Sequence, residues 1–524
     1  MDLFIHPTAI VVLGFVVSCA AVFATDRFAM PKDVRDRTEK SVERRPYLDP
    51  IARVIVVALI FAAFFAISWR PYYATQATIS FFVIFTGISR AKFAFIREPL
   101  VFSDIALVAD VFKYKEIFYA TRLNVLFWVV ALSYVFGASG LYMWLEPDLL
   151  PAKGALLWVF VMIGAALSPW LLLFNKAMNA WIYKATSKLV GKPHVKKSTL
   201  RFGTFTSVVL NFILWLGLKR EEVVHQISAK VSAALHDLWL HSEHPTAPLI
   251  VVWQSESFID LRHFGADVAL PNLDSLRSKA AQWGRMTNVF EGGYTLRTEF
   301  AVLSGLLPEN VHVDASFPYL RASHYKDVVW PQKLKRAGWL THFIHPYDKT
   351  FFMRHKAMPE LGFDQMMMLE DFDHDPKRDG TYVSDQTLTT AVLEKIEQSS
   401  GKTFMFVASM ANHGPWDPSR CPGLTDPVAV YTSLLQDADS ALGRLADHLE
   451  TLERPVWLLF YGDHAPLLKS FADPFPDPRT DYLIVPLGQA KRGGHQPVAA
   501  QEEAPWNLLE RVLHFAGLKQ EVKA

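Results

Sequence analysis

The sequence is poor in cysteine and carries almost no net charge. Its two cysteines, Cys19 and Cys421, lie in an apolar run and a proline-rich loop, so neither a disulfide framework nor a cysteine metal site is indicated. A formal charge of +1 argues against a nucleic-acid partner, because such proteins present a basic patch. The N-terminus also lacks the basic segment and small-residue cleavage site of a removed signal peptide. We therefore expect its first apolar run to be retained.

What the chain has instead is an excess of apolar residues, 51% of the total, concentrated before residue 220. Five apolar runs occupy 8–24, 51–69, 77–88, 123–145 and 155–174. The longer runs suffice to cross a hydrocarbon core of about 30 Å, and aromatic residues lie near their ends, as interface anchors do. We therefore predict a polytopic α-helical membrane domain over residues 1–218, in a multi-pass protein of the cell (inner) membrane that has the lipid bilayer as a partner.

Lysine and arginine in the loops predict the orientation of these spans. Basic residues concentrate in 25–50, 89–122 and 175–201, which places these segments in the cytoplasm. A further apolar run at 202–218 is either a sixth span or an amphipathic helix in the membrane interface. We favour the sixth span, because it puts the rest of the chain on the periplasmic or extracellular side. Residues 219–247 are predicted to form an amphipathic connecting helix.

From residue 248 the pattern changes to alternating strands and helices, which predicts a mostly parallel sheet with helices on both faces. The expected strands are 249–253, 339–344, 403–409, 456–460 and 482–487. The expected helices include 273–283, 330–337, 384–397 and 428–450. We therefore predict an extracytoplasmic α/β catalytic domain over residues 248–524.

Polar residues with catalytic chemistry follow four of these strands. Glu256 comes after the first, His345 after the second, His413 after the third, and Asp463 with His464 after the fourth. In open α/β sheets the ligand site lies beyond the carboxyl ends of the strands. One such residue alone is more often a helix cap or a hydrogen-bonded core histidine. The occurrence of all four favours a single cleft in which they meet.

The stretch from Glu291 to Phe300 supplies a hydroxyl group between the first two strands. Gly292 and Gly293 allow a tight turn or a close approach to a ligand. Thr295 follows, and residues 300–305 are predicted to form a short apolar helix. Backbone N–H groups and the helix dipole favour an anion at such a junction, and Arg297 adds a positive charge. These features predict that Thr295 is a nucleophile for a phosphate or sulfate ester.

Glutamate, aspartate, histidine and a hydroxyl form a mixed oxygen and nitrogen donor set. Such a set suits zinc, manganese or magnesium rather than copper or an iron–sulfur cluster. A threonine hydroxyl is a poor nucleophile at its free pKa. One divalent ion would lower that pKa and would neutralise charge on the phosphorus centre.

Together these segments resemble the lipoteichoic acid synthase and phosphoglycerol transferase branch of the alkaline phosphatase and sulfatase superfamily. The matching pieces are 97–104, 254–258, 293–300, 345–354, 412–416 and 461–466. The resemblance implies a sulfatase-like catalytic domain with one metal ion, for which we expect Mn²⁺, with Zn²⁺ and Mg²⁺ as alternatives. The implied metal ligands are Glu256, Thr295, Asp463 and His464.

The resemblance also implies the reaction and its residues. Glycerol phosphate would pass from phosphatidylglycerol, through a covalent phospho-threonine intermediate on Thr295, to an extracytoplasmic glycan or glycolipid. His413 is the expected general acid for the departing alcohol. His345, Arg354 and His413 would hold the substrate, and we add Arg297 for its charge beside the nucleophile.

The chain departs from the family pattern in ways that leave the donor and acceptor open. Tyr347 and Phe352 replace a polar residue and a tryptophan, Arg297 replaces a small residue, and the family usually has five spans. The rival functions are a phosphoethanolamine transferase, a sulfatase or phosphodiesterase, and a non-catalytic membrane scaffold. Neither cysteine lies in the Cys/Ser-x-Pro-x-Arg run of formylglycine sulfatases, which argues against sulfatase activity.

Overall fold

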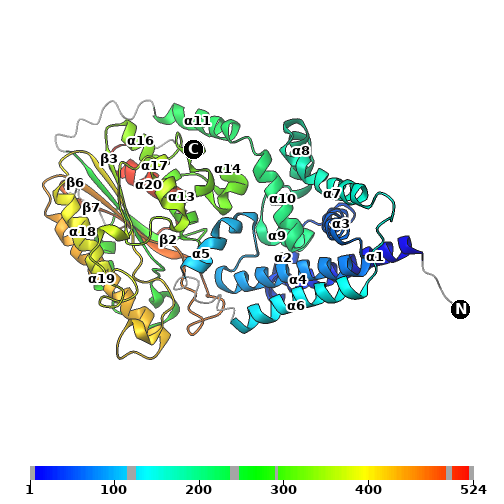
Figure 1. Cartoon of the computed structure of the whole chain (residues 1–524). Coiled ribbons are helices and arrows are strands. Elements are labelled where there is room, and N and C mark those ends of the chain that lie inside the picture. Colours follow the sequence, from blue (N-terminus) through cyan, green and yellow to red (C-terminus); the bar gives the residue numbers. More distant parts are fainter. Residues whose placement is uncertain (1–5, 115–124, 236–246, 290–292, 491–497, 519–524) are drawn as a thin grey trace. The chain divides into compact units, whose positions relative to one another are not determined.

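The computed structural model describes residues 6–114, 125–235, 247–289, 293–490 and 498–518 (Figure 1). Part of the predicted connecting helix, Glu291 and Gly292 lie outside the described residues. The chain divides into two compact units, one formed by 1–113 and 118–218 and the other by 114–117 and 219–524.

The first unit is helical and apolar. Its longest helices are α1 (Pro7–Thr25), α3 (Leu48–Ser68), α4 (Pro71–Ile96), α6 (Val125–Leu145) and α7 (Ala155–Leu171). Within the described part of the chain, four segments are long and apolar enough to cross a membrane: Pro7–Phe28, Leu48–Ser68, Pro71–Ala94 and Ala155–Phe174. Helix α6 is also apolar throughout, and it follows residues outside the described ranges. The expectation of a multi-pass membrane protein is confirmed at this level.

Shorter helices and buried ion pairs complete the first unit. The shorter helices are α2 (Lys32–Glu39), α5 (Val108–Lys113), α8 (Lys176–Val190) and α9 (Val195–Phe202). Arg201 binds both oxygens of Asp49 at 3.0 and 2.9 Å, and Arg53 Nη2 lies 2.7 Å from Asp26 Oδ2. Because each charge is paired, these groups can be buried among apolar helices without an isolated charge.

The segment predicted as a sixth span is divided in the structure. Helix α9 ends at Phe202, Gly203 has a φ of 78°, and α10 covers only Thr204–Gly217. Its 14 residues rise about 21 Å, which is less than the hydrocarbon thickness of about 30 Å. The sixth span therefore stays a prediction that rests on the charge pattern and not on helix length.

The second unit is built on one seven-stranded sheet with the order β2-β7-β6-β1-β5-β3-β4. The strands are β1 (Leu249–Ser255), β2 (Gln282–Met286), β3 (Leu340–Ile344), β4 (Gln365–Met367), β5 (Thr403–Ala408), β6 (Pro455–Gly462) and β7 (Thr480–Gly488). Strands β6, β1, β5, β3 and β4 are mutually parallel, whereas β7 runs antiparallel to both β6 and β2. The predicted mostly parallel sheet is confirmed.

Two short strands, β2 and β4, were not predicted from the sequence. Strand β4 has three residues, which is too short for an apolar period to be visible. Strand β2 contradicts the predicted helix 273–283, because helix α12 covers Pro271–Lys279 and Trp283 lies in the strand. The burial of β2 alternates along its length, as expected for a half-buried strand. Gln282 and Gly284 occupy buried positions, so the alternation is not visible as an apolar pattern in the sequence.

Helices cover both faces of this sheet (Figure 1). Helices α12, α18 (Asp385–Glu397) and α19 (Pro427–Glu450) share one apolar core with the sheet, and α19 contributes Leu435, Leu442 and Leu449 at helical spacing. On the other side lie α13 (Thr295–Ser304), α16 (Trp330–Arg336), α17 (Arg354–Glu360) and α20 (Pro505–Phe515). The remaining helices of this unit are α11 (Arg220–Leu235), α14 (Pro308–Val311) and α15 (Ala322–Tyr325).

Strand β1 lies at the centre of the sheet and fixes where the polar loops begin. All seven of its residues are buried, and Gln254 is in register with Ala408 on one side and Tyr461 on the other. The carboxyl ends of β1, β5 and β6 therefore lie at one edge of the sheet, where a ligand site is expected.

A buried aspartate joins two helices of the first face, and we predict that it is needed for stability. The carboxylate of Asp439 on α19 accepts from the backbone N–H of Asn272 and Leu273 at 3.1 and 2.7 Å, and from the Asn272 side chain at 2.9 Å. In Asp439→Ala these donors lose their acceptor, which should lower the free energy of unfolding by about 2–3 kcal/mol.

Thermal unfolding of the purified full-length protein in detergent measures this loss. Asp447→Ala, on an exposed face of the same helix, is the matched control and should unfold as the wild type does. Equal melting temperatures for the two variants would contradict the prediction.

Candidate active site

Three predicted metal ligands meet beyond the ends of β1 and β6. Potential ligand atoms of Glu256, Asp463 and His464 lie within 4.8 Å of one another, and all three side chains are buried. His464 Nε2 lies 3.2 Å from Glu256 Oε1 and 3.5 Å from Asp463 Oδ2. The strands bring the residues together because Asp463 N donates to the Ser255 carbonyl and continues the β1–β6 ladder by one more bond.

Backbone and hydroxyl donors fix the two carboxylates. Ser257 N and His464 N donate to Asp463 Oδ1 at 2.8 and 2.9 Å, while the Ser257 hydroxyl donates to Glu256 Oε1 at 2.8 Å. Ser257 has a φ of 52°, an unusual conformation for a residue with a side chain. This strained turn directs both donors of one residue at two different ligands, which is the kind of strain that collects at functional sites.

The protonation of this cluster suits a site for a cation. Burial disfavours an imidazolium, but Asp463 and Glu256 outweigh it and raise the pKa of His464 to about 9. Burial and the charge of Glu256 raise the pKa of Asp463 to about 7. Burial also acts to raise the pKa of Glu256, but His464 overcomes it and lowers that pKa to about 2. Without a cation, protons on His464 and Asp463 thus offset the carboxylate charge.

Two atoms of the cluster are left for a metal. Among the described residues, Asp463 Oδ2 and His464 Nε2 are buried and have no hydrogen-bond partner of normal geometry. A carboxylate oxygen and an imidazole nitrogen are donors that Mn²⁺, Zn²⁺ and Mg²⁺ accept to different degrees. The residues therefore fit a divalent ion held by Glu256, Asp463 and His464.

Thr295 is the first residue of helix α13, which therefore begins five residues before the predicted helix 300–305. The residue is 9% exposed, and its side chain acts to lower the pKa of Asp463, so the hydroxyl lies close to the metal-ligand cluster. One turn later the Thr298 hydroxyl donates to the Asp463 carbonyl at 2.9 Å and ties the helix to the end of β6. The nucleophile candidate thus combines a helix N-terminus with the three candidate ligands.

His345 and Arg354 lie together, and both are buried. The guanidinium Nη1 donates to His345 Nε2 at 3.0 Å, and His345 Nδ1 donates to the Ala408 carbonyl at 3.0 Å. Burial and the charge of Arg354 hold the pKa of His345 well below its usual value, so the ring is neutral. Two of the three residues that depart from the family pattern contact this pair. The Tyr347 ring centroid lies 6.2 Å from that of His345, and Arg354 Cζ lies 5.3 Å from the Phe352 ring centroid.

His413 presents one ring nitrogen to the site. Its Nδ1 lies 2.6 Å from the Gly414 carbonyl, which assigns the proton to Nδ1 and leaves the lone pair on Nε2. Burial lowers the pKa of His413 although Glu256 opposes this effect. The side chain is therefore a neutral imidazole that can accept a proton before it donates one.

Arg297 makes contacts on the side of α13 away from the buried face. Its guanidinium lies 4.0 Å from the Tyr294 ring centroid, and Nε donates to the Ser316 carbonyl at 3.1 Å. The side chain is half-buried. Its predicted role in substrate binding stays a prediction.

Sequence reasoning missed several residues that hold the site. Ser409 accepts the Glu256 N–H at 3.0 Å. Arg420 donates to the carbonyls of Ala411, His413 and Pro415 and so fixes the loop that carries His413. Glu299 binds Arg354 inside the domain. The only available signal was the position of Glu299 one helical turn after Thr295.

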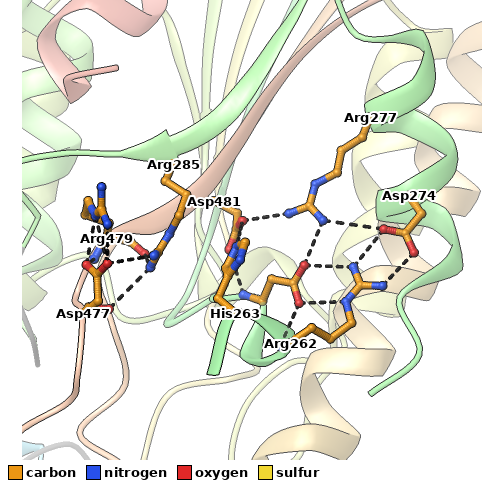
Figure 2. A network of polar contacts seen from close by, with 9 residues as sticks. Arg262, His263, Asp274, Arg277, Arg285, Asp477, Arg479 and Asp481 are labelled. Atoms are coloured by element: carbon orange, nitrogen blue, oxygen red, sulfur yellow. Dashed lines mark hydrogen bonds and ion pairs between the residues drawn. The ribbon is translucent and has the colours of Figure 1, made fainter. Parts of the chain in front are cut away.

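A second group of acidic and histidine residues has a different character. Asp260, His263 and Asp481 also lie close enough for a metal, but Figure 2 shows the surrounding arginines. Arg277 donates to Asp260 and Asp481 at 2.8 and 2.7 Å, and Arg262 holds Asp260 with two bonds. These guanidinium charges already neutralise the carboxylates, so the group is an ion-pair network that joins the β1 loop to α12 and β7.

The sulfatase family model matches residues 248–516. The chain belongs to the sulfatase family. It is 60% identical to the capsular polysaccharide biosynthesis protein RkpI of Rhizobium meliloti (strain 1021), over 98% of this chain and 96% of that one. A protein of the same organism named for cyclic β-1,2-glucan modification is 25% identical over 43% of this chain and 37% of its own.

A solved structure shares the architecture of the whole chain. It is the integral membrane lipooligosaccharide phosphoethanolamine transferase A (EptA) of Neisseria meningitidis, with a TM-score of 0.52, 11% identity and coverage of 95% of both chains. The expected fold, an N-terminal helical membrane domain followed by a sulfatase-like α/β domain, is confirmed. The resemblance drawn from the motifs is confirmed for the superfamily.

Metal binding should depend on pH in a direction set by the cluster. A metal must displace the proton from His464, whose pKa is about 9, and below about pH 7 also the proton from Asp463. Affinity should therefore rise with pH, by about tenfold per unit between pH 7 and 9, more steeply below pH 7, and level off above pH 9. Calorimetric titration of the metal-free protein with Mn²⁺, in buffers of different ionisation enthalpy, counts the released protons. An affinity that is constant between pH 6 and pH 9 would contradict this assignment.

The two acidic groups should differ in metal content. Asp463→Asn removes an anionic ligand and should reduce bound metal to a small fraction of the wild-type amount. Asp481→Asn, in the arginine network, is the matched control and should retain it. Metal analysis of the folded, monodisperse fraction of each variant makes the comparison. Loss of metal from Asp481→Asn, with retention in Asp463→Asn, would reverse the assignment.

Proposed function

We propose that this protein is a metal-dependent phosphoglycerol transferase, which moves glycerol phosphate from phosphatidylglycerol to a glycan or glycolipid on the periplasmic or extracellular side of the membrane. The observation that carries the proposal is the position of Thr295 at the start of α13, with its hydroxyl facing the Glu256, Asp463 and His464 cluster. The apolar first unit supports a lipid donor, because it keeps the enzyme in the membrane that contains that donor.

The proposed reaction has two displacements on phosphorus. The Thr295 oxygen forms a bond to phosphorus and the bond to the diacylglycerol oxygen breaks. An acceptor hydroxyl then attacks the same phosphorus and releases Thr295. A divalent ion bound at the cluster would favour both halves by lowering the pKa of the threonine hydroxyl and neutralising phosphate charge.

His413 is the proposed proton carrier. In the first half Thr295 loses a proton and the departing diacylglycerol gains one. In the second half the acceptor hydroxyl loses a proton and Thr295 regains one. A neutral imidazole with its Nδ1–H held by the Gly414 carbonyl can take up a proton on Nε2 and return it in each half. His413 would therefore act as a general base toward the attacking hydroxyl and as a general acid toward the departing alcohol, and the sequence motifs implied only the second role.

Two relatives support a glycan acceptor. RkpI is named for capsular polysaccharide biosynthesis and is 60% identical along nearly the whole chain. The more distant relative is named for modification of a cyclic glucan. Both names concern polysaccharides, which supports a hydroxyl of an extracytoplasmic glycan as the acceptor.

Mn²⁺ is the proposed ion, because three of the four proposed donors are oxygen atoms, which suit a hard cation. The donor head group is expected to be decided beside His345 and Arg354. There the departures at Tyr347 and Phe352 replace a polar residue and a larger aromatic ring. The alternative to glycerol phosphate as the transferred group is phosphoethanolamine.

The group carried by Thr295 identifies the donor. The full-length protein in detergent, loaded with Mn²⁺, is incubated with phosphatidylglycerol or with phosphatidylethanolamine, and the intact protein and the peptide with Thr295 are analysed by mass spectrometry. We expect a glycerol phosphate adduct on Thr295 from the first lipid, and none in Thr295→Ala. Thr295→Ser, which keeps a hydroxyl, should retain part of the reaction.

Other outcomes separate the rivals. An adduct formed only from phosphatidylethanolamine would replace the proposed donor. Release of free glycerol phosphate, with no transfer to an added capsular glycan, would indicate a hydrolase. If Thr295→Ala transferred the group as fast as the wild type does, Thr295 would not be the nucleophile.

A further inference from the structure

A buried polar layer lies directly behind the proposed catalytic residues. Gln254 lies in β1, two residues before Glu256, and Tyr461 lies in β6, two residues before Asp463. Side chains two residues apart in a strand share one face. Glu299 follows Thr295 by about one helical turn and so shares its face of α13. Three elements thus each provide one residue to the site and one to the layer behind it.

Glu299 is the centre of this layer. Its carboxylate accepts from Arg354 Nε at 3.2 Å and Arg354 Nη2 at 2.9 Å, from Gln254 Nε2 at 3.2 Å, and from the Tyr319 hydroxyl. The Tyr461 hydroxyl in turn donates to Gln254 Oε1 at 2.6 Å. Every one of these side chains is buried, and Glu299 is 0% exposed.

The contacts of Glu299 determine the orientation of Arg354. Glu299 takes Nε and one N–H of Nη2, and His345 takes one N–H of Nη1. A guanidinium has one N–H on Nε and two on each terminal nitrogen, so one N–H on each terminal nitrogen remains for an anion. The same arrangement sets the His345 ring, whose other nitrogen is held by the Ala408 carbonyl.

Burial makes this arrangement rigid. Arg354 is 1% exposed and Glu299 is 0% exposed, and a buried charge that loses its partner is strongly disfavoured. A two-bond contact between a guanidinium and a carboxylate also fixes the plane of both groups. Arg354 is therefore held in one direction before any substrate binds.

We propose that Glu299 is a positioning residue, which acts through Arg354 to aim the two remaining N–H groups of this guanidinium at the phosphate that Thr295 attacks. The proposal rests on the proposed function in one respect, that the substrate is a phosphate ester. Glu299 does not touch the substrate in this scheme. Its carboxylate couples α13, the helix that carries the nucleophile, to α17, the helix that begins at Arg354.

Two measurements on the Mn²⁺-loaded full-length protein test the role. One is calorimetric binding of inorganic phosphate, and the other is the steady-state kinetics of transfer from phosphatidylglycerol. The variants are Glu299→Gln, Arg354→Gln and the double variant. Glu360→Gln, an exposed glutamate at the end of the Arg354 helix, is the matched control and should behave as the wild type.

We expect Glu299→Gln to weaken phosphate binding at least tenfold and to lower kcat/KM by about 100-fold, because the guanidinium is misplaced. Arg354→Gln should give a similar loss, and the double variant should be no worse than Arg354→Gln alone, because Glu299 acts through Arg354. Thermal stability should behave differently. It should fall in Glu299→Gln and recover in the double variant, which has no unpaired buried charge.

Three results from the variants would overturn the role. They are wild-type phosphate binding in Glu299→Gln, losses that multiply in the double variant, and recovery of activity together with stability in the double variant, which would indicate a structural role only. The calorimetric measurement of phosphate binding does not depend on which lipid is the donor. If phosphatidylglycerol is not a donor but phosphate binding follows the expected pattern, the proposed function fails and the role of Glu299 stands. If the wild type binds no phosphate, the role itself fails.

Discussion

The carboxylates of Glu256 and Asp463 are buried close together, and most other groups of the site offset the electrostatic repulsion between them. A pair of like charges away from water is tolerated only when donors and positive charge surround it. Ser257 and His464 supply the donors through an unusual turn. The positive charge is a proton on His464 in the absence of metal and a divalent ion when one is bound. The nucleophile candidate at the start of α13 faces this same charge balance.

The catalytic domain therefore has two polar layers with opposite requirements. The outer layer has incomplete partners, since Asp463 Oδ2 and His464 Nε2 lack normal hydrogen bonds among the described residues. The inner layer around Glu299 is closely paired. A site that accepts a metal and a phosphate, as proposed for this one, needs polar atoms without protein partners, and these stay aligned only if the groups behind them are fixed.

Much of this was predictable because a parallel sheet exposes its strand ends at one edge. Apolar runs followed by Glu256, His345 or Asp463 were sufficient to predict the central strands and the cluster. Thr295 was placed at a junction between a turn and a helix, but α13 begins at Thr295 itself and not at residue 300. The partner of Arg354 was not predictable, since Glu299 lies far from it in sequence and only the fold brings them together. Strand β2 was missed because its buried positions include Gln282 and Gly284. The positive φ of Ser257 could not be predicted either, because serine rarely adopts this conformation.

The short spacing between the last strand residues and their ligands restricts how homologous chains can differ in length. Glu256 directly follows β1, and Asp463 directly follows β6. One added or deleted residue within either strand would turn the following side chain to the opposite face of the sheet, away from α13 and its threonine. Insertions and deletions among relatives should therefore be confined to the connections beyond the ligands, and alignment gaps within β1 or β6 would mark chains that have lost the metal centre.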